Sequence, residues 1–93
     1  MSILFDTRRS EIEIIKEIIE ISNAGAKKTE LLYQGNLSYT LLQNYLGLLL
    51  QHEILEERHI PTNGNNGRSR LYFTTKKGHT LLKDINQMMT HFR

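Results

Sequence analysis

Asn36-Leu-Ser-Tyr-Thr-Leu-Leu-Gln-Asn-Tyr-Leu-Gly-Leu-Leu-Leu-Gln51 is the stretch that decides the fold of this chain. Its apolar residues recur at steps of three and four, which is the spacing of one buried face on a helix. The residues of that face are Leu42, Tyr45, Leu46 and Leu49. Ser38 stands where an N-cap belongs, so the sequence predicts a helix over 38–51.

The other face of this helix is polar but carries no charge. A solvated helix face usually carries Lys and Glu, whereas amide and hydroxyl groups can enter a DNA groove and meet base edges. From this helix alone, a groove-reading face and a merely polar surface are equally good interpretations. The residues that would read bases are Ser38, Tyr39, Thr40, Gln43 and Asn44.

A first helix is expected over 9–22. Ser10 followed by Glu13 is a capping box, which marks a helix start. Six isoleucines at helical spacing predict a broad buried face, and they are Ile12, Ile14, Ile15, Ile18, Ile19 and Ile21. Gly25 is suited to the left-handed C′ position that ends such a helix.

A short helix over 29–34 and a tight turn at 35–37 precede the helix over 38–51. Leu31, Leu32 and Tyr33 offer apolar contacts in the short helix. The segment 26–28 is long enough only for a bridge of strand. Two helices joined by a short glycine-containing turn are typical of a helix-turn-helix.

After His52 the apolar period changes to about two, which predicts strands over 54–60 and 68–74. Between them, 61–67 contains two Asn-Gly steps that favour a turn. The tip of this hairpin is flanked by Arg68 and Arg70, with Arg58 on the partner strand, so a basic flank is expected to meet phosphates. A hairpin directly after a helix-turn-helix is a wing. The predicted fold class is therefore α+β, a winged helix-turn-helix with three core helices, a β-hairpin wing and an extra C-terminal helix.

Thr75 is a good N-cap for a last helix from Lys76 to about Phe92. Its apolar residues repeat at three- and four-residue steps, and they are Leu81, Leu82, Ile85, Met88, Met89 and Phe92. The distal half of this stripe would be exposed in a monomer, which predicts a homodimer joined along 76–92. The alternative is that the stripe folds back on the isoleucines of the first helix.

The 93 residues suit one domain over 1–93, and the absence of cysteine excludes disulfides and thiolate zinc sites. No apolar run is long enough for a membrane span, and the start lacks a signal peptide, so a cytoplasmic protein is expected. The net charge is +2, but residues 24–93 carry nine basic and five acidic residues. This uneven distribution favours a polyanionic partner.

An enzyme finds little support in this sequence, and no metal, cofactor or membrane partner is expected. The four histidines are His52, His59, His79 and His91, and their spacing matches no recognised ligand set. Glu56 and Glu57 could suggest paired carboxylates, but adjacent residues on a strand point to opposite faces.

The segments 26–39 (AKKTELLYQGNLSY) and 75–82 (TKKGHTLL) resemble the small archaeal winged-helix DNA-binding proteins. The resemblance covers about 8–90. It implies a recognition helix over Ser38–Gln51, a wing over about Ile60–Arg70, and dimers joined by their C-terminal helices. Some members of that group are counted among nucleoid proteins.

The expected function is sequence-specific binding of double-stranded DNA by a dimeric transcriptional regulator associated with the nucleoid. The residues expected to contact phosphates are Lys27, Lys28, Arg68, Arg70, Lys76 and Lys77. The glutamates near them would be kept off the DNA face or would temper non-specific binding. Two alternatives stay open: an architectural DNA-binding protein, and a winged helix that binds proteins. Leu41, Leu48 and Leu50 are the best support for the protein-binding alternative.

Overall fold

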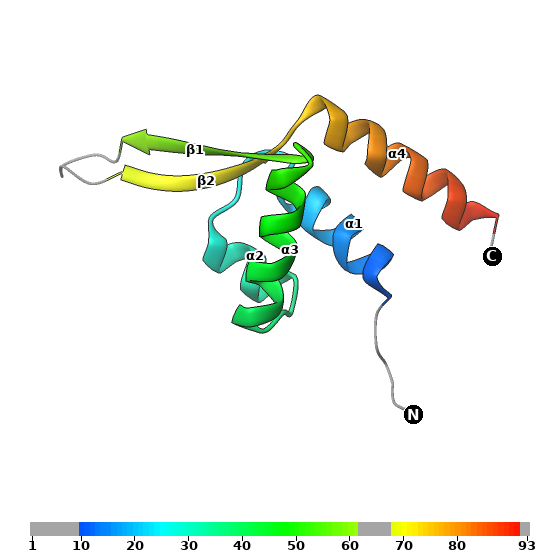
Figure 1. The fold of residues 1–93 in the computed structure, drawn as a ribbon, viewed down its shortest axis with the longest axis horizontal. Helices are drawn as coiled ribbons and strands as arrows, with labels where there is room; N and C mark the ends of the chain where they lie inside the picture. The colour runs from blue at the N-terminus through cyan, green and yellow to red at the C-terminus, as the bar shows by residue number, and fades with distance from the viewer. Residues whose placement is uncertain (1–9, 62–67, 92–93) are drawn as a thin grey trace.

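The computed structural model describes residues 10–61 and 68–91. Within them the elements run α1 (Glu11–Ile21), α2 (Lys28–Gln34), α3 (Tyr39–Gln51), β1 (Leu55–Pro61), β2 (Arg68–Thr74) and α4 (Lys76–Thr90). The two strands form one antiparallel hairpin that extends away from the helices, and α4 extends to the other side (Figure 1). The predicted fold class, an α+β winged helix-turn-helix, is confirmed.

Helix α1 starts at the predicted capping box. The Glu13 N–H donates to Ser10 Oγ over 3.1 Å, and the Ser10 N–H donates to Glu13 Oε1 over 2.9 Å. The helix therefore begins at Glu11, two residues later than expected, because Ser10 itself is the cap. Its buried face is also narrower than the six isoleucines suggested. Ile14, Ile18 and Ile19 are buried, Ile15 and Ile21 are half-buried, and Ile12 is exposed.

Gly25 does not end α1 as its C′ residue, because the C-cap is Ser22 and Gly25 lies three residues later. It does have a left-handed backbone, with φ at +99°. A Cβ at this position would stand 2.7 Å from the Phe73 ring. Glycine is therefore needed here both for the φ angle and for the close approach of the ring. The predicted bridge follows at once: Ala26 and Tyr72 exchange backbone hydrogen bonds of 2.9 and 2.8 Å.

The corner between α2 and α3 is a Schellman motif, in which two backbone N–H groups close the end of α2. The Asn36 N–H donates to the Tyr33 carbonyl over 3.2 Å, and the Leu37 N–H donates to the Leu32 carbonyl over 3.1 Å. The left-handed residue is Asn36, with φ at +53°, rather than Gly35. Ser38 then caps α3 as predicted, because its Oγ accepts the Leu41 N–H over 3.2 Å.

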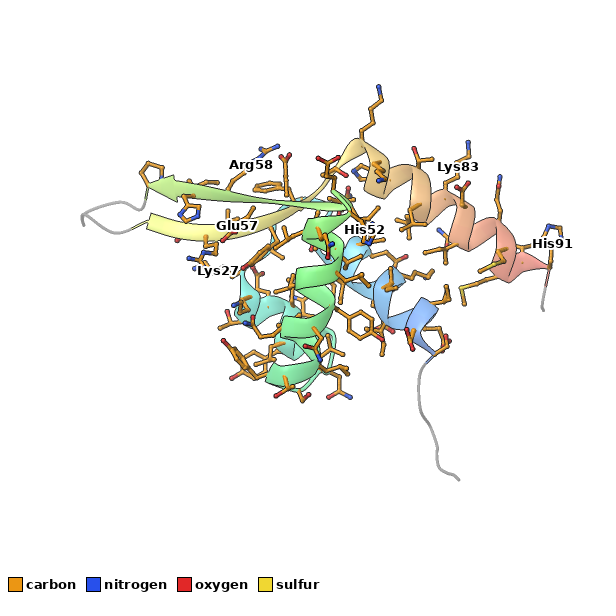
Figure 2. All side chains as sticks on the ribbon, in the orientation of Figure 1. Lys27, His52, Glu57, Arg58, Lys83 and His91 are labelled. Carbon is orange, nitrogen blue, oxygen red and sulfur yellow. The ribbon has the colours of Figure 1, made fainter. Side chains whose placement is uncertain are left out.

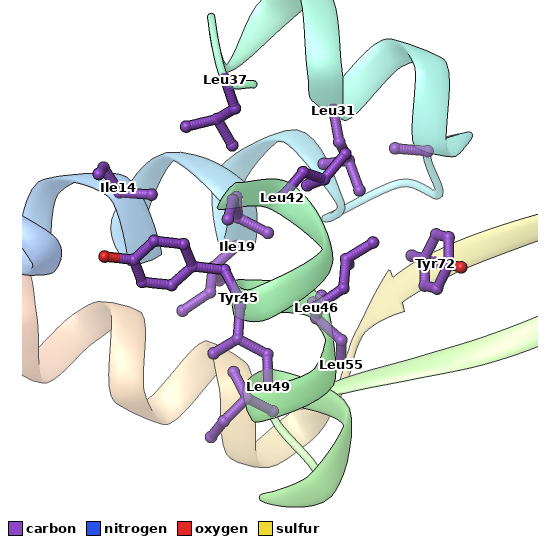
Figure 3. Close-up of a cluster of buried hydrophobic side chains, with 13 residues drawn as sticks. Ile14, Ile19, Leu31, Leu37, Leu42, Tyr45, Leu46, Leu49, Leu55 and Tyr72 are labelled. Carbon is purple, nitrogen blue, oxygen red and sulfur yellow. The ribbon is translucent and has the colours of Figure 1, made fainter. Parts of the chain in front are cut away.

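The apolar stripe of α3 forms the centre of the core, as the periodicity predicted (Figure 3). It packs with the isoleucines of α1 and with apolar residues from the other elements, and those are Leu31, Leu37, Ile54, Leu55 and Tyr72. Tyr45 lies at the edge of this cluster. Burial raises the pKa of its hydroxyl, and the negative charge of Glu11 raises it further. Helix α3 is thus held against the other elements by its inner face.

The hairpin pairs Leu55 with Thr74 at its base and Pro61 with Arg68 at its outer end. Strand β1 lies one residue later than expected, because the chain leaves α3 through a left-handed Glu53 and a buried Ile54. Buried Thr74 donates its hydroxyl to the Ile19 carbonyl over 2.6 Å, which fixes the hairpin base to α1. The predicted turn at 61–67 lies outside the described residues except for Pro61.

Helix α4 begins where Thr75 Oγ1 accepts the Gly78 N–H over 2.9 Å, as predicted. The Thr75 hydroxyl also donates to the Glu53 carbonyl over 2.6 Å, so the cap is tied to the end of α3. Gly78 is buried against this junction, with the Ile54 carbonyl directly beside it. Helix α4 then packs along α1 and ends at Thr90, short of the expected Phe92, which lies outside the described residues.

Candidate nucleic-acid interface

The outward face of α3 is exposed and uncharged. Thr40, Gln43, Asn44, Gly47 and Gln51 are all exposed, and no residue from Tyr39 to Gln51 carries a charge. Ser38, at the start of the helix, is exposed too, although its hydroxyl is occupied by the cap. The structure therefore brings the proposed base-reading residues together on one accessible surface, around the first two turns of α3.

Tyr39 is joined to the start of α2. The Lys28 Nζ lies 5.6 Å from the centroid of the Tyr39 ring, which is the range of a cation–π contact. This contact places a positive charge beside the N-terminal end of α3. Tyr39 nevertheless remains 59% exposed.

Lys27 lies next to Lys28, and its side chain is exposed. Its backbone N–H is already occupied, because it donates to Glu30 Oε1 over 2.8 Å. Any contact with a phosphate at this position would therefore come from the Lys27 ammonium group rather than from its amide. Lys27 and Lys28 together give α2 a basic start that adjoins the polar face of α3.

The arginines of the hairpin do not form one basic flank. Directly paired residues share a face, so the register places Glu57, His59 and Arg70 on the side of buried Tyr72 and α2. Glu56 and Arg58 lie on the opposite side, as Figure 2 shows for Arg58 and Glu57. The expectation of a shared basic flank is therefore wrong for Arg58. The side chain of Arg68 lies outside the described part of the structure.

Both described arginines of the hairpin are paired with a carboxylate. Arg58 forms an ion pair with Glu56, and its guanidinium carbon lies 4.3 Å from the centroid of the Phe73 ring. On the other face, Arg70 Nε lies 2.5 Å from Glu57 Oε2. A hydrogen bond with Tyr72 and the charge of Glu57 raise the pKa of Arg70. Glu57 therefore shares a face with Arg70, so of the two roles expected for the glutamates, a tempering of non-specific binding is the one that this position suits.

Lys76 and Lys77 are exposed at the start of α4, at the opposite end of α3 from Ser38. They line a hollow of about 520 Å³ together with three carboxylates, those of Glu53, Glu56 and Glu57. The structure thus separates this pair from the basic start of α2. The predicted phosphate contacts whose side chains are described therefore do not make a single patch, and these are Lys27, Lys28, Arg70, Lys76 and Lys77.

The structure places Tyr33 differently from the sequence-based expectation. Tyr33 was expected to offer an apolar contact, but 80% of its surface is exposed, and only Leu31 of α2 is fully buried. A residue two positions from Leu31 lies about 200° around a helix, so the 3.6-residue period could have predicted this exposure. Tyr33 is thus a further aromatic side chain available to a ligand.

The residues predicted for a dimer interface differ in how deeply they are buried. Ile85 is 4% exposed and packs inside its own protomer, so part of the stripe folds back on the core. Leu81 and Leu82 are half-buried against that core. Met89 is half-buried too. Met88 is 42% exposed.

Among residues 10–61 and 68–91, no group of three His, Asp or Glu side chains gathers as metal ligands would. No helix in the same residues is long and apolar enough to cross a membrane. The histidines of the hairpin and of α4 are exposed.

Comparisons with known proteins agree with this architecture. Residues 8–91 match the model of a family described as winged helix-turn-helix. Over 88 residues the chain is 34% identical to an uncharacterized protein of Methanocaldococcus jannaschii, a match that covers 94% of this chain. The chain spans only 37% of the length of that relative.

Two solved structures share the fold. One is Sso10a-2, a DNA-binding protein from Sulfolobus solfataricus, with a TM-score of 0.72 and 23% identity over 88% of this chain and 80% of that one. The other is the circadian clock associated protein Pex from Anabaena, with a TM-score of 0.65 and 17% identity over 88% of this chain and 77% of that one.

Proposed function

Because the chain belongs to the winged helix-turn-helix family, we propose that it binds double-stranded DNA with α3 in the major groove. The observation that carries the proposal is the exposed, uncharged outer face of α3. Gln43 and Asn44 can each form two hydrogen bonds with an adenine edge, and Thr40 can contact a thymine methyl group. Family membership also agrees with the prediction that the chain is not an enzyme.

Basic groups on both sides of α3 would position the protein on the DNA backbone. Lys27 and Lys28 adjoin the N-terminal end of α3, where the base-reading residues lie. Arg70 lies on the face of the hairpin that turns toward α2, so the wing over 60–70 would contact a neighbouring stretch of backbone. Contacts of this kind carry affinity but little sequence information. Lys76 and Lys77 line a separate hollow at the start of α4, together with Glu53, Glu56 and Glu57.

We propose further that the protein is a homodimeric, sequence-specific regulator of transcription that acts in the cytoplasm, on the nucleoid. A dimer would present two copies of α3, and half-sites one helical turn apart need a separation of about 34 Å. Exposed Met88 and the half-buried Leu81, Leu82 and Met89 of α4 support an interface along this helix. Ile85 would act within each protomer, holding α4 against α1.

Selection of bound sequences from a random pool of duplexes tests this proposal most directly. A regulator enriches one motif, with a half-site spacing that reports the dimer geometry. Enrichment of no motif, with uniform protection in a footprint, would indicate an architectural role instead. In a separate titration, the logarithm of affinity should fall linearly with the logarithm of salt concentration. A flat titration would contradict binding through phosphates.

One observation favours a second candidate function, the binding of a protein partner. Leu41 and Leu48 are 37% and 43% exposed on one edge of α3. Leu48 also lines an apolar hollow of about 320 Å³ with residues of α1 and α4, among them Ile15 and Leu81. A gel shift with random duplex at low salt separates the two functions. No shift at any protein concentration, with a specific protein recovered by affinity capture, would favour the protein-binding module.

A further inference from the structure

We propose that Glu57 competes with DNA phosphate for Arg70 and so tempers the affinity of the wing. This inference rests on the proposed function, because it concerns how the same surface meets DNA. It starts from Arg70, whose side chain is the only described arginine side chain on the α2 side of the hairpin. That arginine is already bound by a carboxylate of its own chain, with Arg70 Nε 2.5 Å from Glu57 Oε2.

The pair follows from the strand register. Arg70 stands directly opposite His59, and Glu57 stands opposite Tyr72, so Arg70 and Glu57 are diagonal neighbours on one face. Tyr72 is buried and marks this face as the one that turns toward the helices. The bridge between Ala26 and Tyr72 brings the chain just before Lys27 beside this part of β2. Glu57 thus lies on the same face of the hairpin as Arg70, and its inner neighbours are the residues of the hollow that Lys76 and Lys77 also line.

The ion pair between Arg70 and Glu57 is exposed enough for Arg70 to leave the carboxylate and bind a phosphate instead. The Arg70 side chain is 55% exposed and the Glu57 side chain is 30% exposed, so solvent screens their attraction. Exposed pairs of this kind are weak, and a phosphate that approaches the wing presents the same acceptor chemistry as the carboxylate. His59 Nε2 lies 3.6 Å from the same Glu57 oxygen, so a polar side chain remains beside the carboxylate when Arg70 leaves. Binding of DNA therefore exchanges one partner of Arg70 for another, instead of adding a contact to a free cation.

Such an exchange lowers affinity without altering which bases are read. Each phosphate that a free cation neutralises adds about 0.9 to the slope of log affinity against log salt. An arginine held by a carboxylate contributes less than this, because the carboxylate must recover a counterion of its own. The wing then adds little to non-specific affinity, and the uncharged face of α3 carries a larger share of the selection between sequences.

Glu57→Gln tests this inference, and Glu56→Gln is its matched control. Both changes remove one negative charge from β1, but Glu56 pairs with Arg58 on the opposite face. Affinity for one fixed duplex is measured by fluorescence anisotropy at several salt concentrations. Glu57→Gln should bind about two- to fivefold more tightly at low salt than Glu56→Gln, which is the scale of one exposed ion pair. Its salt slope should also be steeper than that of Glu56→Gln, by up to about 0.9.

The same measurements in an Arg70→Gln background identify the route of the effect. If Glu57 acts through Arg70, Glu57→Gln should no longer increase DNA affinity more than Glu56→Gln does in that background. Equal gains from the two glutamate changes, or a gain that persists without Arg70, would overturn the inference while leaving DNA binding intact. Failure of the native protein and of every variant to bind duplex at low salt would overturn the proposed function itself. Circular dichroism melts check that all variants remain folded.

Discussion

Gly78→Ala should destabilise the protein, although the same change in a helix normally stabilises it. Gly78 lies in the first turn of α4, and alanine is favoured over glycine in helices by up to about 1 kcal/mol. Here, however, a Cβ would stand 2.3 Å from the Ile54 carbonyl oxygen and 2.7 Å from Thr74 Cγ2. The first neighbour is backbone, so the helix start has to move away from the hairpin base.

The size of the effect follows from what this movement disturbs. Overpacking of a buried site costs about 1–3 kcal/mol. The Thr75 N–H bond to the Ile54 carbonyl, of 3.0 Å, and the Thr75 hydroxyl bond to Glu53 lie at the same junction, and each such bond contributes about 0.5–1.5 kcal/mol. With the helix preference subtracted, we expect a net loss of about 2–4 kcal/mol. For a domain of this size that corresponds to a decrease in Tm of roughly 10–25 °C.

Gly47→Ala is the matched control, because it makes the same chemical change inside another helix. Apart from its chain neighbours and the backbone of its own helix, no atom lies within 4 Å of the position its Cβ would take, so only the helix preference remains. This variant should be more stable than the native protein by about 0.5–1 kcal/mol. Thermal and denaturant unfolding followed by circular dichroism measure both variants. If Gly78→Ala is as stable as Gly47→Ala, the reasoning about the α4 junction is refuted.

Three further predictions concern the cap of α4, the outer face of α3 and the proposed dimer. Thr75→Val should lower the free energy of unfolding by about 1–2 kcal/mol, because it removes the N-cap and the bond to the end of α3; denaturant titration measures this. Gln43→Ala combined with Asn44→Ala should flatten the motif recovered by sequence selection while binding to random duplex persists. Met88→Glu should shift the protein toward monomer in light scattering, because it places a charge on the exposed apolar edge of α4.

Exposed positions on other faces supply the controls for these variants. Gln87→Ala on α4 should leave the selected motif unchanged, and Lys83→Glu, which is exposed on α4, should leave the oligomeric state unchanged. An unchanged motif after the double substitution in α3 would show that this face does not read bases. An unchanged mass for Met88→Glu would count against an interface at that residue. An unfolding free energy for Thr75→Val equal to that of the native protein would show that the threonine cap contributes nothing.

Most elements of the fold could be predicted because their signals are local. The Ser10 capping box, the Ser38 and Thr75 N-caps and the apolar stripe of α3 each depend on residues within about four positions of one another. Hydrogen bonds of caps and the 3.6-residue period act over that same distance, so they can be read from a short window of sequence. The errors of one or two residues at the starts of α1, α2 and β1 arise where two neighbouring residues could each serve as the boundary.

The sequence by itself determined the kind and order of the elements, the uncharged outer face of α3 and the match to a family, because these depend on local pattern. Only the tertiary structure decided what each exposed or buried group meets. In the folded protomer Ile85 is buried, Tyr33 is exposed, and Gly78 lies against the Ile54 carbonyl. The tertiary structure also paired Arg70 with Glu57, which are thirteen positions apart in the chain, because the strand register makes them diagonal neighbours. Contacts of this kind depend on how separate elements pack, and no short stretch of sequence contains that information.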